Sequence, residues 1–382
     1  MTSKPVRTLL HVFPGFGPGG AQMRFASVAN HLGPTYRHLV VAMNGATDAV
    51  RLLAPELNVE LLTIPVQTGN SWRNIKIFTQ TLRRLQPDLL VTSNWGSIEW
   101  AIANWAAWLP HLHLEDGFSG EEAERQFSRR VWARRLTLRR SIVVVPSRTL
   151  YKIARETWRI PASRLLYVPN GVDCDRFTAT GDPAHRAGAG IPNCDVPLVG
   201  TVARLSPEKN LHRLIDAFAM VLREERRALL VIVGDGPERD SLTEHVRAKG
   251  LESFVIFTGK CPNPERLLPF FSVFALSSDT EQMPLSVIEA MAAGVPIAAT
   301  DVGDVREMIS EQNQDFVVEK DVGMLASAIT RLLDAPDRAR RIGAANAHRA
   351  RERYSQSKMF ETYHQLFDGK LLRAEQLDRV PG

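Results

Sequence analysis

Short apolar segments alternate with longer helical patterns along nearly the whole chain, and this alternation restricts the folds that the chain can adopt. It is typical of parallel β-sheets whose strands are connected by helices. Strands are expected at 8–13, 38–42, 60–63, 89–92, 111–114 and 142–145, and again at 198–202, 229–233, 255–257, 273–276 and 296–299. The clearest helical patterns lie at 21–32, 75–85, 210–223 and 285–293. The sequence therefore predicts an α/β protein.

A stretch of linker composition interrupts this rhythm near the middle of the chain. Residues 178–197 are rich in Gly, Pro and Thr, and the sequence Val-Pro-Asn-Gly-Val-Asp stands just before them at 168–173. A chain of 382 residues is also too long for one ordinary hydrophobic core. We therefore expect two α/β domains, residues 1–178 and 179–353, followed by a helical segment at 354–382.

The cysteines and the apolar runs bear on the cellular compartment. Cys174, Cys194 and Cys261 are scattered, and their spacing fits neither a disulfide framework nor a metal site. No apolar run reaches the roughly eighteen residues that a membrane-spanning helix needs. The N-terminal apolar stretch is also too short for a signal peptide. The sequence thus predicts a cytoplasmic protein that is soluble or lies on a membrane surface.

The net charge of +5 is divided unevenly along the chain. Residues 1–170 contain 21 Lys and Arg against 11 Asp and Glu, so the remainder is net negative. Much of the excess lies between Arg125 and Arg140, where seven arginines interleave with apolar residues. This segment is either a solvated helix face or a patch that meets an anionic membrane surface. No base-stacking aromatic array accompanies the charge, so nucleic acid is not expected as a partner.

Glycines cluster where the first expected strand ends. Residues 14–20 read Pro-Gly-Phe-Gly-Pro-Gly-Gly and lead directly into a helix, whose first amides can meet an anion. Gly15, Gly17 and Gly20 match the spacing of dinucleotide-binding loops. The second expected strand, however, ends without the Asp or Glu that would hold the ribose. A glycine loop beside an interdomain cleft, or a structural turn, fits better than an NAD site.

Charged residues also follow two expected strands of the second half. Arg204 and Lys209 come after the strand at 198–202, at the edge where open α/β sheets bind ligands, and could neutralise a diphosphate leaving group. Glu281 follows the strand at 273–276, and Glu289 lies on an apolar helix, where a carboxylate has to be paired or bound to a ligand. Two carboxylates alone would fit a hydrolase. A site in which the carboxylates bind sugar and ribose hydroxyls and the cations bind phosphates accounts for all four residues.

Five motifs in this order resemble those of the retaining glycosyltransferases of family 4. That family has the GT-B fold, two Rossmann-like domains that face each other across a cleft. The motifs are Gly19-Gly20, Pro169–Asp173, Ala203-Arg204-Leu205 with Lys209, Gly234–Pro237, and Glu281 with Glu289. The resemblance covers nearly the whole chain. It implies transfer of a sugar from a UDP- or GDP-sugar with retention, without a metal or other cofactor, and a C-terminal helix that returns to the N-terminal domain.

The resemblance places the donor mainly on the C-terminal domain. Arg204 and Lys209 would bind the diphosphate and stabilise the departing nucleotide. Glu289 would hold the ribose, and Glu281 would contact the transferred sugar. Further donor contacts are implied for Gly19, Gly20, Gly234, Gly259, Lys260, Met283, Pro284, Leu285 and Ser286.

The resemblance places the acceptor on the N-terminal domain. Many relatives carry a histidine before a glycine where this chain has Asp116. Asp116 is expected to take the place of that histidine as a catalytic residue, with His113 as the alternative. A histidine within a strand could equally belong to the core. Asn94, Trp95 and Glu115 are expected on the same side.

The basic N-terminal half would suit an anionic, lipid-linked acceptor. We therefore expect a role in bacterial surface polysaccharide or glycolipid synthesis at the inner face of the membrane. Two alternatives remain: another GT-B enzyme such as a sugar-nucleotide epimerase, and a non-catalytic binder of sugar nucleotides. An epimerase would consume a sugar nucleotide without any acceptor. A non-catalytic binder would be expected to have lost site residues, but Arg204, Lys209, Glu281 and Glu289 are all present in this sequence.

Overall fold

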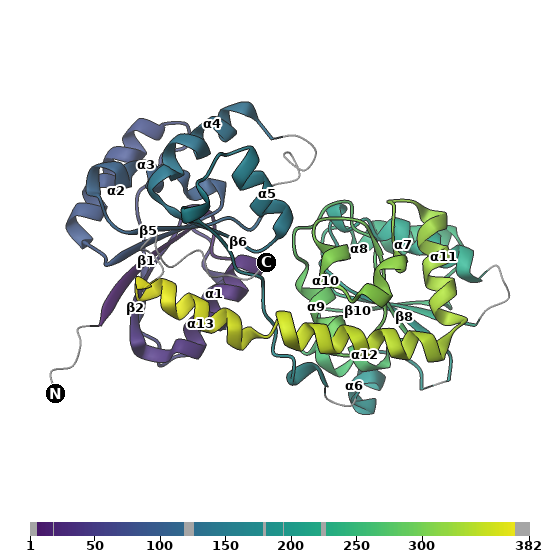
Figure 1. The fold of residues 1–382 in the computed structure, drawn as a ribbon. Coiled ribbons are helices and arrows are strands. Elements are labelled where there is room, and N and C mark those ends of the chain that lie inside the picture. Colours follow the sequence, from purple (N-terminus) through teal and green to yellow (C-terminus); the bar gives the residue numbers. More distant parts are fainter. Residues whose placement is uncertain are drawn as a thin grey trace. The chain divides into compact units, whose positions relative to one another are not determined.

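The computed structural model describes residues 6–17, 19–117, 126–178, 181–193, 195–222 and 227–370 (Figure 1). The chain divides into two compact units. Unit 1 comprises residues 1–169 and 358–382, and unit 2 comprises residues 170–357. Each unit is built around one parallel sheet with helices on both faces, which confirms the predicted α/β class and its division into two Rossmann-like halves.

The sheet of unit 1 has seven strands in the order β3-β2-β1-β4-β5-β6-β7, and all neighbours are parallel. The strands are β1 (Arg7–Phe13), β2 (Tyr36–Ala42), β3 (Val59–Leu62), β4 (Leu89–Ser93), β5 (His111–Leu114), β6 (Ile142–Val145) and β7 (Leu165–Tyr167). Nearly every residue of β4, β5 and β6 is buried, because helices cover both faces of a parallel sheet.

Two helices cover one face of this sheet and four cover the other (Figure 1). The first face carries α1 (Gly20–Leu32) and α13 (Gln356–Phe367), and Phe360 and Tyr363 of α13 pack in the same apolar cluster as Val28 of α1. The second face carries α2 (Ser71–Leu85), α3 (Ile98–Ala107), α4 (Ser128–Thr137) and α5 (Arg148–Glu156). The C-terminal helix is therefore part of the core of unit 1.

The sheet of unit 2 has six strands in the order β10-β9-β8-β11-β12-β13. They are β8 (Leu198–Val202), β9 (Leu229–Val233), β10 (Val255–Gly259), β11 (Val273–Leu276), β12 (Ile297–Thr300) and β13 (Val317–Val318). Helices α7 (Leu211–Leu222), α8 (Arg239–Ala248) and α11 (Val322–Leu333) pack on one face. Helices α9 (Leu285–Ala292) and α10 (Val305–Met308) pack on the other, and α12 (Pro336–Arg353) contributes to both clusters.

All eleven expected strands are present, and the structure adds the short strands β7 and β13. The expectation of a plain linker at 178–197 is wrong in part, because α6 (Pro183–Gly188) forms there. The Asp182 carboxylate caps this helix by accepting the amides of Ala184 and His185.

The unit boundary also differs from the expected one. It lies at 169/170 instead of 178/179, because Val172, Cys174 and Phe177 are buried in the core of unit 2. At the other end, residues from 358 onward belong to unit 1. The last part of the segment 354–382, residues 371–382, lies outside the described residues.

Candidate active site

Each sheet has one point at which its strand order reverses. In unit 1 the reversal lies between β1 and β4, and in unit 2 it lies between β8 and β11. Ligands of open parallel sheets bind outside the carboxyl ends of the strands at such points. The glycine loop follows β1 and Asn94 follows β4, whereas Arg204 follows β8 and Glu281 follows β11. The sequence motifs therefore gather at the two reversal points.

An ion pair joins the two loops at the reversal point of unit 2. The Lys209 Nζ atom lies 2.6 Å from Glu281 Oε1. The Ser278 hydroxyl donates to the same oxygen at 2.8 Å, and the Ser277 hydroxyl donates to the Lys209 carbonyl at 3.0 Å. Lys209 and Glu281, predicted from separate motifs, thus lie in direct contact.

Asp279 provides a second connection between the same loops, which sequence reasoning missed. Its carboxylate accepts from Asn210 Nδ2 at 3.0 Å and pairs with Arg213 at 2.7 Å. Asn210 holds a left-handed backbone conformation (φ 42°), which non-glycine residues adopt rarely. Arg213 also donates to the Ser277 carbonyl at 2.8 Å. The loops that carry Lys209 and Glu281 are therefore held in place from the side of α7.

Arg204 is exposed at the end of β8. Among the described residues, no carboxylate forms an ion pair with its guanidinium. The loop that carries it is fixed by its neighbours, since the Ala203 amide donates to Val233 and the Leu205 amide donates to Asp235. An unpaired guanidinium on a fixed loop is suited to bind an anion.

The close packing of these loops requires a glycine at position 234. Its backbone has φ 136°, and a Cβ atom there would lie 1.8 Å from the Ala203 carbonyl oxygen. Its amide donates to the Gly259 carbonyl at 2.9 Å, next to the exposed Lys260. Gly234 therefore brings the ends of β8, β9 and β10 together.

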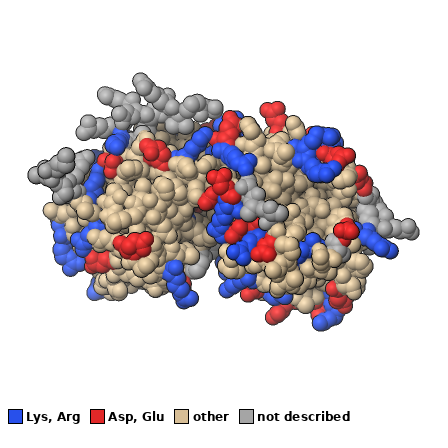
Figure 2. Space-filling view, turned by 90° about the horizontal axis from the view of Figure 1, so that it is seen from below, with Lys and Arg blue, Asp and Glu red and all other residues tan. Residues whose placement is uncertain are grey.

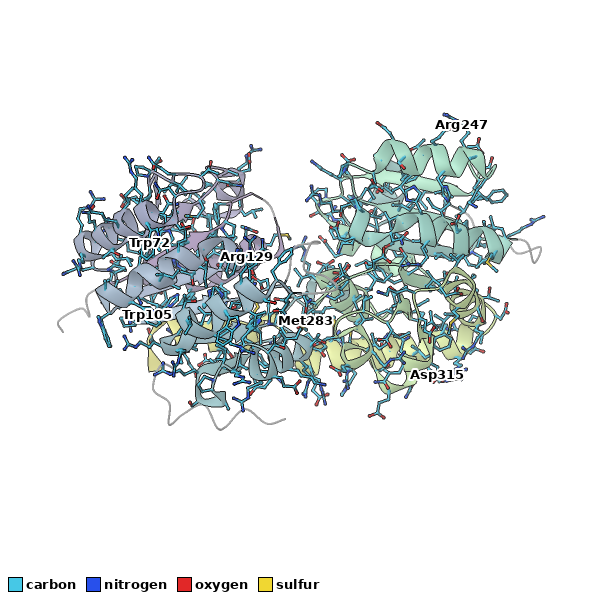
Figure 3. All side chains as sticks on the ribbon, turned by 90° about the horizontal axis from the view of Figure 1, so that it is seen from above. Trp72, Trp105, Arg129, Arg247, Met283 and Asp315 are labelled. Atoms are coloured by element: carbon cyan, nitrogen blue, oxygen red, sulfur yellow. The ribbon has the colours of Figure 1, made fainter. Side chains whose placement is uncertain are left out.

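Helix α9 begins at the same edge. Pro284 is its N-cap and no side chain caps it, so the amides of its first turn, near Leu285 and Ser286, are open to an anion. The preceding Met283, labelled in Figure 3, is buried, and its carbonyl accepts from Asn170 Nδ2 at 3.3 Å. Asn170 belongs to the Pro-Asn-Gly motif, which thereby supports the start of α9.

Glu289 lies one turn further along α9 and is largely buried. Burial raises the pKa of its carboxyl group to about 7, with an opposing effect of Arg176 and a further rise from Glu265. Arg176 and Glu265 form an ion pair at 2.9 Å. Among the described residues, no hydrogen-bond donor meets the Glu289 carboxyl group. The carboxylate of Glu289 is thus available to a ligand that donates hydrogen bonds.

In unit 1, Asp116 forms a buried ion pair that sequence reasoning missed. Both of its carboxylate oxygens accept from the Arg24 guanidinium, one of them at 2.9 Å. Burial alone would lower the pKa of Arg24, but the Asp116 carboxylate raises it above its usual value. Tyr363 of α13 packs over the guanidinium, and the Asp116 amide donates to Asn94 Oδ1 at 2.7 Å. Asn94 itself has φ 57°.

His113 and Glu115 lie in the interior instead of at the surface of the site. Both are almost fully buried. His113 contacts Thr92 Oγ1 at 2.8 Å through Nδ1 and Glu115 at 3.4 Å through Nε2. Glu115 also accepts from Arg134 Nε at 3.1 Å. The structure therefore corrects the expectation that these two side chains face the acceptor, since β5 directs them toward an arginine of α4.

Trp95 is half-buried beside this cluster. The guanidinium carbons of Arg134 and Arg130 lie 5.1 and 5.4 Å from its ring. Cationic contacts of this kind fix the indole at the end of β4. Of the residues expected on the acceptor side, Asn94, Trp95 and Asp116 thus reach the edge of the sheet.

The glycine loop leaves open space at the start of α1. Gly19 is the N-cap and no side chain caps the helix. A Cβ atom on Gly17 or Gly20 would meet nothing within 4 Å, whereas one on Gly19 would lie 2.8 Å from Gln22 Oε1. The first turn of α1 can therefore be approached by a ligand.

Two further searches concern the described residues only. No three His, Cys, Asp or Glu side chains come together there in a way that could hold a metal ion, and independence of metals stays a prediction. None of the described helices is long and apolar enough to cross a membrane.

Comparison with known proteins gives two family matches. Residues 189–349 match the family described as Glycosyl transferases group 1, and residues 18–176 match Glycosyltransferase Family 4. The two matches together span most of the chain.

Among curated proteins, the chain is similar to 2-deoxystreptamine glucosyltransferase of Streptomyces kanamyceticus, with 31% identity over 53% of this chain and 54% of that protein. It is also similar to a GDP-mannose-dependent α-(1-6)-phosphatidylinositol monomannoside mannosyltransferase of Mycobacterium tuberculosis, with 35% identity over 48% of this chain and 51% of that protein. The chain thus spans about half the length of these relatives. The fold matches HepE of Anabaena, solved in complex with UDP, with TM-score 0.79 and 22% identity over 95% of this chain and 100% of that one.

Proposed function

Because the chain belongs to the family-4 glycosyltransferases of the GT-B fold, we propose that it transfers a sugar from a nucleotide diphosphate sugar to an acceptor hydroxyl with retention of configuration. The observation that carries this proposal is the grouping at the reversal point of unit 2. Three features lie there at one edge of the sheet: Arg204, for which the described residues offer no ion-pair partner, the Lys209–Glu281 pair, and the uncapped start of α9. Cations and free amides favour phosphates, and carboxylates favour hydroxyl groups.

Each group has a proposed role toward the donor. Arg204, Lys209 and the first amides of α9 bind the diphosphate. Glu289 accepts the ribose hydroxyls, which would supply the donors that its carboxylate does not meet among the described residues. Glu281 contacts the transferred sugar. UDP and GDP both remain candidates for the nucleotide, since the HepE structure is named for UDP and the mycobacterial relative for GDP-mannose.

The reaction that fits this arrangement is attack on the same face of the sugar that the nucleotide leaves. The bond from the anomeric carbon to the phosphate oxygen breaks, and the acceptor oxygen bonds to the same carbon. The acceptor proton passes to the departing phosphate. Arg204 and Lys209 offset the charge that develops on the diphosphate, a role that fixed cations can perform without a metal.

The acceptor is proposed to bind unit 1 at Asn94, Trp95 and Asp116. Arg24 would act as a positioning residue, because it holds both oxygens of the Asp116 carboxylate. The open space at Gly17 and Gly20 leaves the first amides of α1 accessible to an anionic group of a ligand.

An anionic membrane surface at the cytoplasmic inner face is proposed as the setting, with polysaccharide or glycolipid synthesis as the role. Helices α2 and α3 expose Trp72 and Trp105, and α4 exposes Arg129 (Figure 3). Helix α4 also exposes Trp132. Tryptophan and arginine together are typical of surfaces that meet lipid headgroups. The segment 125–140 contributes less surface charge than expected, because Arg134 is buried against Glu115. Arg125 lies outside the described residues. The face shown in Figure 2 mixes both signs of charge.

The proposal is tested by incubating the protein with UDP-glucose, UDP-N-acetylglucosamine and GDP-mannose, each with an alkyl glycoside as acceptor. We expect release of one nucleoside diphosphate and a glycoside product with the anomeric configuration of its donor. Glu281→Gln should abolish both. Formation of an epimeric sugar without an acceptor would instead identify an epimerase. Binding of a donor without any turnover would identify a non-catalytic binder.

A further inference from the structure

A cavity lies at the opposite end of the unit 1 sheet from Asp116. It has a volume of about 350 Å³ and opens at the amino end of β5. Its lining includes Trp105, Trp108, His111, Arg140, Ser141 and Arg164. Asp116 follows the carboxyl end of the same strand, so this cavity is separate from the candidate active site.

Two tryptophans are held at the mouth of the cavity with much of their surface in solvent. Trp105 is 43% exposed and Trp108 is 70% exposed. The Trp105 indole donates to the Thr137 carbonyl at 3.1 Å (Figure 3 labels Trp105). Trp108 ends α3 in a left-handed conformation with φ 57°. The fold thus fixes two large apolar rings at the surface, where their exposure costs free energy unless something covers them.

The turn after Trp108 is also fixed. The Asn104 side chain accepts from the Leu109 amide at 3.0 Å and donates to the Leu109 carbonyl at 2.9 Å. This pair of hydrogen bonds closes the end of α3 and sets the direction of the chain at Trp108. The position of the indole therefore follows from the backbone of the fold.

Arg140 is oriented by these rings and has no carboxylate partner in the described part of the chain. Its guanidinium carbon lies 3.9 Å from the centre of the Trp108 ring and 5.5 Å from that of Trp105. Arg164 donates to the Arg140 carbonyl at 2.8 Å, which brings the two arginines to the same wall. Among the described residues, neither guanidinium pairs with an acid, and none of the lining residues is Asp or Glu. The wall is therefore cationic and open to an anion.

The floor of the cavity is polar but neutral. His111 contacts Ser141 Oγ at 2.7 Å through Nδ1 and Thr92 Oγ1 at 2.8 Å through Nε2. Burial, with a contribution from His113, lowers the pKa of His111 to about 3. The positive charge at the cavity thus comes from Arg140 and Arg164.

We propose that this cavity binds the phosphate-bearing headgroup of an anionic lipid. A guanidinium can donate two parallel hydrogen bonds to a phosphate, which a lysine cannot reproduce. Exposed indoles are the side chains that prefer the headgroup level of a bilayer. The two features together suit a phosphodiester that enters with its glycerol and the start of its acyl chains against the tryptophans. The inference rests on the membrane association proposed above and adds a defined site to it.

The matched pair Arg139→Gln and Arg140→Gln tests this site. Both residues are exposed neighbours that carry the same charge, but only Arg140 lines the cavity. Binding of the full chain to phosphatidylcholine vesicles with and without phosphatidylglycerol is measured by co-sedimentation. We expect Arg140→Gln to weaken binding to the anionic vesicles about tenfold, as loss of a charge-assisted hydrogen bond would. Arg139→Gln should weaken binding less, by at most about fivefold, because a surface charge without a direct phosphate contact contributes up to about 1 kcal/mol.

A second experiment with soluble ligands distinguishes a lipid headgroup from free phosphate. Indole NMR signals of Trp105 and Trp108 are followed during titration with glycerophosphoglycerol and with inorganic phosphate. The proposal expects the headgroup to shift both signals in the unchanged chain and neither in Arg140→Gln. Equal binding of inorganic phosphate, together with vesicle binding that is insensitive to Arg140, would overturn a lipid site. Equal losses of vesicle affinity in Arg139→Gln and Arg140→Gln would also overturn the lipid site. That result would indicate a diffuse attraction to the membrane and would not affect the proposed donor site.

Discussion

The Nζ atom of Lys209 lies 2.6 Å from Oε1 of Glu281, and this ion pair joins the loops that follow β8 and β11. The cation proposed for the diphosphate and the carboxylate proposed for the sugar thus neutralise each other. A bound diphosphate would give Lys209 a second anionic partner, and Glu281 would keep the Ser278 hydroxyl at 2.8 Å. The two residues are therefore expected to act as a unit.

Removal of the Lys209 ammonium should impair catalysis much more than stability. Lys209→Ala is expected to lower kcat by roughly 10²–10³-fold, as loss of one charge-stabilising group does in other enzymes. The free energy of unfolding should change by only about 1 kcal/mol, because the pair is partly solvated. Steady-state donor turnover and urea unfolding measure the two effects.

Lys249→Ala is the matched control for this experiment. Lys249 pairs with Asp216 at 2.8 Å in the same unit but away from the reversal point. Its loss should leave kcat unchanged. Equal losses of activity in both variants would indicate a general effect of charge and contradict the role of Lys209.

Glu289 should make the stability of unit 2 depend on pH near neutrality. Its folded-state pKa of about 7 lies above the ordinary value of 4.5. The contribution of Glu289 to the free energy of unfolding is therefore complete below pH 4.5 and is lost as the pH rises from 4.5 through 7. Glu289→Gln should match the unchanged chain at pH 4 and exceed its free energy of unfolding by about 3 kcal/mol at pH 8.

The same titration should appear in nucleotide binding. Ribose hydroxyls donate to a carboxylate, so affinity should rise with pH through 7 in the unchanged chain and stay flat in Glu289→Gln. Calorimetric titration from pH 5.5 to pH 8 checks this. Parallel pH profiles of the two proteins would rule out Glu289 as the ribose ligand.

The Arg24–Asp116 pair should show strong coupling. Asp116→Asn leaves a buried guanidinium without its anion, which we expect to destabilise unit 1 by about 3 kcal/mol. Arg24→Met should cost a similar amount. The double variant should lose less unfolding free energy than the two single variants together, with a coupling energy of about 1–3 kcal/mol. Additive losses in thermal unfolding would show that the pair does not form in solution.

Buried histidines should make unit 1 sensitive to acid. His38 is fully buried beside His11, at 3.0 Å between ring nitrogens, and burial lowers its pKa from 6.5 to about 4. Its neutral form stabilises the fold above pH 6.5, and this stability is lost as the pH falls from 6.5 through 4. His38→Gln should reduce the slope of unfolding free energy against pH by about 1.4 kcal/mol per unit in that window. An unchanged slope in urea unfolding would contradict this assignment.

The strands could be predicted from the sequence because nearly all are short apolar runs buried on both faces. The two strands that were missed, β7 and β13, have three and two residues, which is too short for a pattern to stand out. The helix α6 was missed because its Gly and Pro residues are typical of loops. Its Asp182 cap was the available signal, since Asp before Pro commonly starts a helix.

Those residues of the candidate site that belong to a motif of fixed spacing could be predicted from the sequence. Lys209 and Glu281 follow strands whose ends the topology brings together, and Glu289 lies on the helix α9 that begins at the same edge. Their partners could not be predicted, because a single sequence gives no contact between residues as far apart as Arg24 and Asp116. Arg134 was expected either on a solvated helix face or in a membrane-facing patch for the same reason, although it pairs with Glu115 inside unit 1.

The central claim is that the reversal point of unit 2 binds a nucleotide diphosphate, and calorimetric titration of UDP and GDP tests it most directly. The proteins compared are the unchanged chain, Arg204→Ala and Arg247→Ala, the latter an exposed arginine of α8 labelled in Figure 3. We predict that one nucleotide binds the unchanged chain and Arg247→Ala with equal affinity, and binds Arg204→Ala at least about tenfold more weakly. Equal affinity for all three proteins, or no binding of either nucleotide, would contradict the account.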